Sequence, residues 1–325
     1  MKKLITKTSL YLLIFLFSLE ILVRVFHLAK DTPTRFLDEH KVEKWLPNQS
    51  GYDVTGNRRQ NFSEYHINNS GFNSYREFTP SSNIIEVAII GDSFIEGFHQ
   101  NYYNSIGKKI ENKLNIEVYE YGYAGYDFAD QLHLISAYQD QFDLIDHVIL
   151  GIKFSNDLTR GEYHVVTSRL QLESPLNKIL KKSKLLVHAK SIGLLDPPKL
   201  LIQNIINLIS KPKNITSSAK DGDDKSNKAK QLELTYLNNF ETLISKYNFN
   251  KEKFTLLLDS SITPSIFINY LNANGINYID FSPSFEKTKK PTTLIYDRHW
   301  NNHGRTLISE VISSYLIQKG IVHSN

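Results

Sequence analysis

Ser93 and His299 have the residue types and the sequence settings for nucleophilic acyl chemistry. Ser93 ends a Gly-Asp-Ser sequence after a run of apolar residues, and His299 lies two residues after Asp297 and next to Trp300. A serine hydroxyl attacks an ester carbonyl only when a base removes its proton, and a carboxylate can orient that base. We therefore predict Ser93 as the nucleophile, His299 as the general base and Asp297 as its partner. Trp300 is expected either to pack in the core or to stack on a sugar ring of the substrate.

Acyl transfer also needs hydrogen-bond donors that are already in place for the oxyanion of the tetrahedral intermediate. The loop 121–126 contains two glycines, whose backbone N–H groups can approach a ligand closely. Gly125 is the predicted donor and Gly122 the alternative. Asn156 follows a further apolar run and offers a side-chain amide. The predicted oxyanion hole therefore consists of the N–H of Ser93, the N–H of Gly125 and the amide of Asn156.

These residues follow segments that read as alternating strands and helices. Strands are predicted at residues 84–90, 116–121, 147–152, 254–259 and 276–281, and the first of these is a short apolar run typical of a buried strand. Helices are predicted at residues 103–114, 128–139, 232–247, 264–274 and about 302–319. Strands that alternate with helices form a largely parallel sheet covered on both faces. Because ligand sites of such sheets lie at the carboxyl ends of strands, Ser93, Gly125 and Asn156 are expected to meet there.

The order of these blocks resembles the SGNH, or GDSL-type, hydrolase superfamily. The resemblance covers residues 84–163 and about 232–320, and its four name-giving residues fall on Ser93, Gly125, Asn156 and His299. It implies a flavodoxin-like three-layer αβα sandwich with a mostly parallel sheet, acting on ester bonds without a cofactor or a metal. The Asp-x-His spacing, continuing as His-Trp-Asn, looks like a membrane-attached branch that includes polysaccharide O-acetyltransferases. The segment NNSGFNSYRE before the first predicted strand also resembles that branch.

The N-terminal segment reads as a membrane helix. Three lysines at positions 2, 3 and 7 precede an uncharged run from Thr8 to Leu19, and the 24 residues from Ile5 to Leu28 suffice to span a bilayer. Glu20 and Arg24 are spaced so that they can pair on a helix. No small-residue cleavage site follows, so we predict an uncleaved signal-anchor with a cytoplasmic N-terminus and an extracytoplasmic remainder. A buried or surface amphipathic helix is the alternative.

The remaining chain divides by composition. We predict the signal-anchor at residues 1–30, an irregular juxtamembrane lead-in at 31–80 and the SGNH-like domain at 81–325. An insertion at residues 164–231 interrupts this domain, and its polar part, 211–230, is expected to be disordered. Within the insertion, the lysines of residues 178–184 are typical of a solvated helix face.

Composition excludes several classes of function. Zero cysteines exclude disulfides, thiolate metal sites and a cysteine nucleophile. A net charge of +4 is too small a bias to indicate a nucleic-acid partner. The leading hypothesis is a membrane-anchored extracytoplasmic serine esterase or acyltransferase for an envelope glycan or lipid, with water or a sugar hydroxyl as the acceptor. The alternative is a non-catalytic envelope polysaccharide-binding or assembly protein with the same fold.

Overall fold

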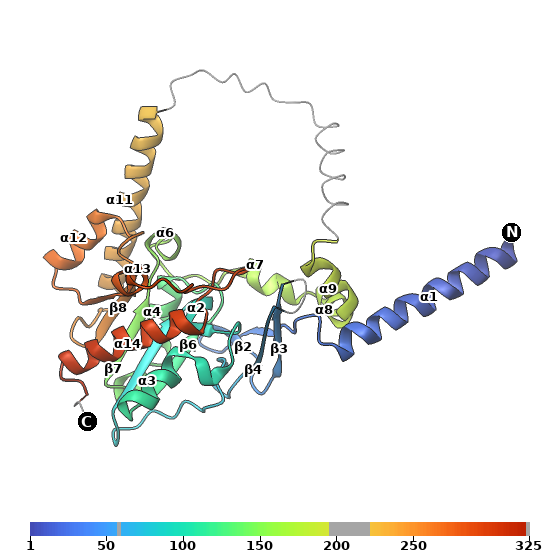
Figure 1. Ribbon diagram of the computed structural model, residues 1–325. Coiled ribbons are helices and arrows are strands. Elements are labelled where there is room, and N and C mark those ends of the chain that lie inside the picture. Colours follow the sequence, from blue (N-terminus) through green and yellow to red (C-terminus); the bar gives the residue numbers. More distant parts are fainter. Residues whose placement is uncertain (57–59, 195–221, 323–325) are drawn as a thin grey trace. The chain divides into compact units, whose positions relative to one another are not determined.

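The computed structural model describes residues 1–56, 60–194 and 222–322, and its chain forms two compact units (Figure 1). Unit 1 comprises residues 1–32, 51–63 and 167–219, and unit 2 comprises residues 33–50, 64–166 and 220–325. All of the predicted site residues belong to unit 2.

Unit 2 is built on a parallel five-stranded sheet. Its strands are β5 (Glu86–Gly91), β6 (Glu117–Gly122), β7 (His147–Gly151), β8 (Phe254–Leu258) and β9 (Tyr278–Asp280). Their order is β6-β5-β7-β8-β9, and every adjacent pair is parallel. This is the flavodoxin-like order, in which the chain first extends the sheet to one side of β5 and then returns to the other. The predicted three-layer sandwich with a mostly parallel sheet is confirmed.

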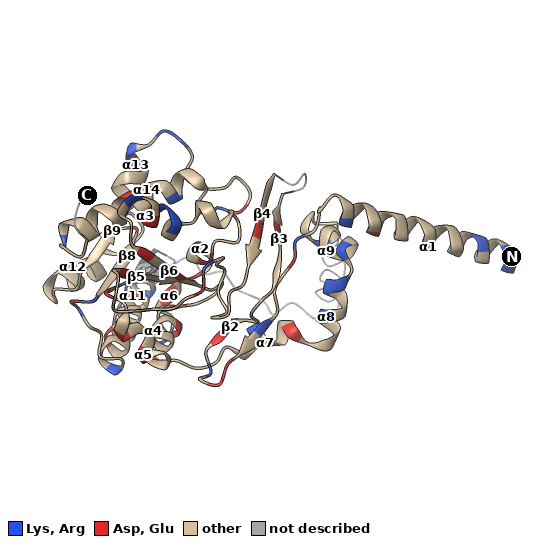
Figure 2. Cartoon of the chain, turned by 90° about the horizontal axis from the view of Figure 1, so that it is seen from below, with Lys and Arg blue, Asp and Glu red and all other residues tan. Residues whose placement is uncertain are grey.

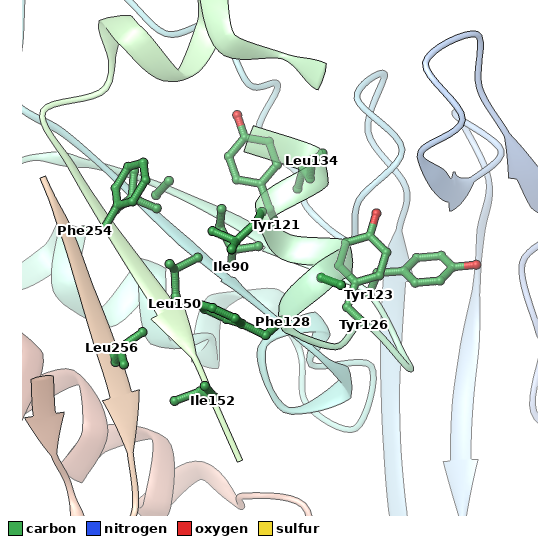
Figure 3. Close-up of a cluster of buried hydrophobic side chains, with 14 of the residues drawn as sticks. Ile90, Tyr121, Tyr123, Tyr126, Phe128, Leu134, Leu150, Ile152, Phe254 and Leu256 are labelled. Atoms are coloured by element: carbon green, nitrogen blue, oxygen red, sulfur yellow. The ribbon is translucent and has the colours of Figure 1, made fainter. Parts of the chain in front are cut away.

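Side chains alternate between the two faces of the sheet and build a hydrophobic core on each. Ile90 and Leu150 face the core beneath α4 (Phe128–Ala137), α11 (Gly222–Lys246) and α12 (Ser265–Ala273). Figure 3 shows this core, with Tyr121, Phe128 and Leu256 around Ile90 and Leu150. Ile89 and Ile149 face the other core, beneath α3 (Ile106–Leu114) and α14 (Asn302–Gln318). All six residues of β5 are buried, so the strand that precedes Ser93 is held on both faces.

Shorter helices complete unit 2. They are α2 (Ser93–Glu96), the 3₁₀ turn η1 (Tyr102–Asn104), α5 (Gln139–Leu144), α6 (Phe154–Asp157) and α13 (Ser282–Lys287). The helix predicted from residue 103 begins at Ile106 instead, because the Ser105 side chain accepts a hydrogen bond from the N–H of Lys108 and caps it.

The segment predicted to be disordered differs from the expectation in part. Residues 211–221 lie outside the described residues, but residues 222–230 belong to α11, which therefore begins ten positions before the predicted start. Near its start, α11 includes exposed residues that are good helix formers, namely Lys228, Ala229, Lys230 and Gln231. Because the rest of α11 is packed against the core, this first part can extend the helix without a buried face of its own.

The lead-in predicted to be irregular contains four short strands. β1 (Arg35–Leu37) and β2 (Glu43–Trp45) form an antiparallel pair, and β3 (Ser50–Thr55) and β4 (Asn61–His66) form another two-stranded sheet. The prediction of irregular structure was wrong because strands this short carry little periodicity and are stabilised by packing. Trp45, for example, is almost completely buried.

Unit 1 contains the predicted membrane helix, α1 (Lys2–Val25), which is long and apolar enough to cross a membrane and is almost entirely exposed. The predicted pair forms, with Arg24 Nε donating to Glu20 Oε1 at 2.8 Å. The insertion contributes α7 (Thr167–Leu170), the 3₁₀ turn η2 (Gln171–Glu173), α8 (Pro175–Lys182) and α9 (Lys184–Ser191).

Candidate active site

The structure brings Ser93, His299 and Asp297 together in one hydrogen-bonded relay. His299 Nε2 lies 2.8 Å from Ser93 Oγ, and His299 Nδ1 is hydrogen-bonded to Asp297 Oδ1. With Nδ1–H donating to the carboxylate, Nε2 is left as the acceptor for the serine proton. All three side chains are partly exposed, so a substrate can reach them. The relay has the connectivity that the sequence predicted across about 200 residues.

A tight hairpin places Asp297 and His299 on the same side of the chain. The N–H of Leu294 donates to the carbonyl of His299 at 2.8 Å, and Thr293 pairs with Trp300 in an antiparallel bridge. Between Asp297 and His299, Arg298 adopts a left-handed conformation with φ of 64°. Such a conformation costs a residue other than glycine about 1–2 kcal/mol. We interpret this strain as the cost of the one-residue spacing, since it lets both side chains point at the relay.

Ser93 is positioned by the turn from β5 into α2. Asp92 caps α2 by accepting from the N–H of Phe94 at 2.9 Å, and burial raises the pKa of the Asp92 carboxyl. A side chain at Gly122 would collide with the backbone of this turn, because a Cβ built there lies 2.0 Å from the N of Glu96. The glycine at the end of β6 is therefore needed for the serine turn to pack against that strand.

The loop that contains Gly125 is hydrogen-bonded to Glu96, a residue that the sequence analysis did not single out. Glu96 Oε1 accepts from the N–H of Ala124 at 3.0 Å and from Trp45 Nε1 at 2.6 Å. Gly125 itself has φ of 97°, which only glycine adopts readily. Because Glu96 lies three residues after Ser93, one short helix fixes both the predicted nucleophile and the predicted oxyanion loop.

Arg35 of β1, in the lead-in, contacts the same loop through Tyr123. It donates to the hydroxyl of Tyr123 at 2.6 Å and pairs with Glu43 at 3.2 Å. Its guanidinium also lies 4.5 Å from the ring centroid of Trp45 and 4.9 Å from that of Tyr123. Cation–π contacts at such partly buried sites contribute about 1 kcal/mol each. The strands β1 and β2 are thus part of the support for the candidate site.

The structure places Asn156 in α6, just beyond the end of β7, with its amide bonded to a neighbouring acid. Asn156 Nδ2 donates to Asp157 Oδ1 at 2.9 Å, and Asp157 Oδ2 accepts from the N–H of Lys153 at 2.7 Å. Burial and the nearby charge of Asp92 raise the pKa of Asp157 to about 8. Among the described residues, no hydrogen bond joins Asn156 to Ser93 or His299. Asp157 fixes one amide hydrogen and leaves the other for a ligand.

A cavity of about 240 Å³ lies beside the serine turn. Asp92 and Phe94, the neighbours of Ser93, both line it, and its other walls come from the ends of β7 and β8 and from Trp300. Trp300 is 9% exposed and packs with its ring centroid 4.8 Å from that of Phe94. The two roles expected for Trp300, packing and lining a substrate site, are therefore compatible with its position.

His99 is a second residue that the sequence analysis missed. Its Nδ1 lies 3.5 Å from Asp297 Oδ2, and its ring centroid lies 4.1 Å from that of His299. The ligand atoms of His99, Asp297 and His299 all lie within 4.8 Å of one another and could hold a metal ion. No sequence signal indicated His99, since it follows Ser93 by six residues without a recognisable spacing.

Glu96→Gln is expected to change how stability depends on pH. Burial raises the pKa of Glu96 to about 7 from its ordinary 4.5. Between these two pH values the carboxyl keeps its proton in the folded state and releases it in the unfolded state. Wild-type stability therefore falls as pH rises through this range, by up to about 3 kcal/mol. Glutamine does not titrate, so the variant lacks this loss. Denaturant unfolding of both proteins at about pH 4.5 and about pH 8 measures it, and equal pH dependence in the two would contradict the assignment.

Comparison with known proteins gives low similarity. No protein-family model matches this chain, and no curated protein matches it. A solved structure described as a G-D-S-L-family lipolytic protein from Desulfitobacterium hafniense is 14% identical, covers 70% of this chain and 98% of its own, and has a TM-score of 0.39. A lipase/acylhydrolase from Enterococcus faecalis is 11% identical, with 74% and 99% coverage and a TM-score of 0.40.

An acetylxylan esterase from Geobacillus stearothermophilus, solved as a catalytic mutant, is 12% identical, with 76% and 100% coverage and a TM-score of 0.35. At these identities and TM-scores the similarities carry no argument about activity or substrate.

Proposed function

We propose that this protein is a serine esterase or acyltransferase of the SGNH type that works through an acyl-enzyme. The observation that carries the proposal is the relay from Ser93 Oγ through His299 to Asp297, at the carboxyl end of a parallel sheet. Chemistry at this edge is usual for such sheets. Neither a metal nor an organic cofactor enters the proposed reaction.

The reaction runs in two halves. Ser93 Oγ attacks the ester carbonyl carbon while its proton passes to His299 Nε2, and Asp297 stabilises the imidazolium. The oxyanion is assigned to the N–H groups of Ser93 and Gly125 and to the free amide hydrogen of Asn156. The intermediate collapses as His299 returns the proton to the leaving alcohol, which leaves an acyl ester on Ser93. Water or a sugar hydroxyl, deprotonated by His299, then takes the acyl group and regenerates the serine.

The cavity beside Ser93 supports an acyl group or a sugar ring as the part of the substrate that is recognised. Its walls include Phe94, Phe281 and Trp300, and Lys153 and Asp259 also line it. Apolar walls with a few polar groups are typical of small-molecule sites. We assign the substrate to the esters, O-acetyl groups included, of an envelope glycan or lipid.

The test is a fluorophosphonate labelling experiment combined with an acyl-donor screen, with and without saccharide acceptors. The proposal predicts a covalent adduct on Ser93 and release of acid or transfer of acyl from at least one ester donor. A folded wild-type protein that neither labels nor turns over any donor would favour the alternative, a non-catalytic glycan-binding or assembly protein.

We also propose that α1 is an uncleaved membrane anchor that leaves unit 2 outside the cytoplasm. Its 24 residues have a length of about 36 Å, enough for a hydrocarbon core of about 30 Å. Lys2, Lys3 and Lys7 at its start favour a cytoplasmic N-terminus.

For the anchor, the expected result is a full-length chain in the membrane fraction. Mass spectrometry of that fraction should find the Met1-containing peptide, and protease added to the extracytoplasmic side should digest unit 2. The matched control for orientation is a variant with Lys2, Lys3 and Lys7 replaced by Glu, expressed in intact cells. Without these positive charges the cytoplasmic orientation of the N-terminus should be weakened. A mature chain that starts near residue 30 in a soluble fraction would refute the anchor.

A further inference from the structure

The helices α8 and α9 of unit 1 present apolar side chains to the outside. On α8, Leu176, Ile179 and Leu180 are spaced three and four residues apart and so share one face of the helix. Leu176 is 67% exposed and Ile179 is 64% exposed. On α9, Leu186 is also exposed. Single exposed leucines need no explanation, but a stripe of them along a short helix does.

The same helices are strongly basic. Residues 175–191 contain no aspartate or glutamate, and their lysines are Lys178, Lys181, Lys182, Lys184 and Lys190. Figure 2 shows the basic residues in blue along α8 and α9. A solvated face accounts for the lysines alone, but it does not account for the apolar stripe beside them. A basic helix with an exposed apolar face is typical of a segment that lies in the interface of a membrane.

These helices are fixed to the C-terminal end of α1. Glu20 accepts from the backbone N–H groups of Lys184 at 2.9 Å and Leu185 at 2.8 Å, and Arg24 donates to the carbonyl of Lys182 at 2.5 Å. Beyond the helix end, His188 Nδ1 lies 2.9 Å from the carbonyl of Leu28. Because Glu20 and Arg24 are in the last turns of α1, the junction of α8 and α9 lies at the level where a spanning helix leaves the hydrocarbon.

We infer that α8 and α9 form a docking surface for an anionic lipid bilayer, with Leu176, Ile179 and Leu180 in the headgroup boundary and the exposed Lys178, Lys182 and Lys190 against lipid phosphates. Lys181 and Lys184 are instead paired within the chain, with Glu173 and Asp31. This inference rests on the proposed membrane insertion of α1. Charge complementarity favours anionic lipid over a second copy of this chain, since residues 175–191 would meet their own positive charge across a symmetric contact. Unit 1 would then contact the bilayer through α8 and α9 as well as through α1, and these contacts would fix its orientation on the membrane.

The absence of cysteine allows a direct test with single-cysteine variants of the full-length chain. Ile179→Cys would carry an environment-sensitive NBD probe in vesicles of phosphatidylcholine, with or without about 30% phosphatidylglycerol. The exposed Ser314 of α14 provides the control, Ser314→Cys. We expect a blue-shifted emission at position 179 and quenching by shallow doxyl lipids about twofold stronger in the anionic vesicles. The probe at position 314 should show neither.

A third probe separates this inference from the anchor on which it rests. Leu13→Cys reports whether α1 is inserted, through quenching by deep doxyl lipids. Quenching at position 13 without quenching at position 179 would overturn the docking surface and leave the anchor intact. No quenching at position 13 would overturn the anchor and the docking surface together.

A variant with Lys178, Lys182 and Lys190 all replaced by Gln completes the test, because these three lysines are exposed. It should lose the response of the probe at position 179 to phosphatidylglycerol. A probe at position 179 that is shielded equally in detergent and in both kinds of vesicle would mean that protein covers this face, and that result would also overturn the inference.

Discussion

Ser93→Ala is expected to lower ester turnover by about 10⁴–10⁶-fold while leaving the fold intact. The reason is that Ser93 Oγ is the atom 2.8 Å from His299 Nε2, so the variant removes the hydroxyl that we propose forms the acyl-enzyme. Stability should change little because Ser93 is partly exposed and its cap, the Asp92 side chain, is retained. Steady-state kinetics on a model acetyl ester and circular dichroism measure the two effects.

Ser155→Ala is the matched control for this prediction. Ser155 also follows a strand of the sheet and is exposed, and no hydrogen bond to His299 is found for it within the described residues. It should keep wild-type turnover and wild-type fluorophosphonate labelling, whereas Ser93→Ala should lose both. Turnover that survives in a folded Ser93→Ala protein would show that the nucleophile lies elsewhere.

The second large effect distinguishes His299 from Asp297. His299→Ala removes the group that carries the proton in both directions, so its loss should approach that of Ser93→Ala. Asp297→Asn should leave more residual activity, because the hairpin that closes between Thr293 and Trp300 still places the imidazole near Ser93. The kinetics of both variants across about pH 5–9 measure the difference.

The pH–rate profile of Asp297→Asn should also shift in a direction that can be predicted. A general-base imidazole produces an ascending limb at about pH 6–7. Without the carboxylate of Asp297 the charged ring is less stabilised, so the limb should move to lower pH. His99 lies 3.5 Å from the same carboxylate and is the residue to replace next, as His99→Gln, if the limb does not move. Equal losses in His299→Ala and Asp297→Asn would make the acid as essential as the base.

The two residues that sequence reasoning missed have a common cause. Glu96 and His99 are ordinary polar residues in the chain, and only their contacts give them a role. Glu96 meets Ala124 and Trp45, which lie 28 and 51 positions away, and His99 meets Asp297. No local pattern encodes such distant pairs, because they depend on which strands become neighbours in the sheet.

The parallel sheet and the order of its strands and helices could be predicted from the sequence, and so could the pairing of Ser93, His299 and Asp297. Buried strands such as β5 need continuous apolar runs, helices need apolar residues at helical spacing, and both patterns can be read from neighbouring residues. Since parallel strands end at one edge, the residues that follow β5, β6 and β7 lie near one another there, whereas His299 reaches Ser93 from the 293–300 hairpin outside the sheet.

The tertiary structure alone decided the rest. The short strands β1 and β2 of the lead-in are held by Arg35 and Trp45, which contact Tyr123 of the loop 121–126, and their own residues carry no strong strand pattern. The left-handed Arg298 is held by a hairpin whose closure depends on the surrounding core. The lysine-rich α8 is attached to α1 through Arg24, which donates to the carbonyl of Lys182, and α9 is attached through Glu20, which accepts from the N–H of Lys184. Local periodicity reports which residues must be buried, whereas long-range packing decides what they are buried against.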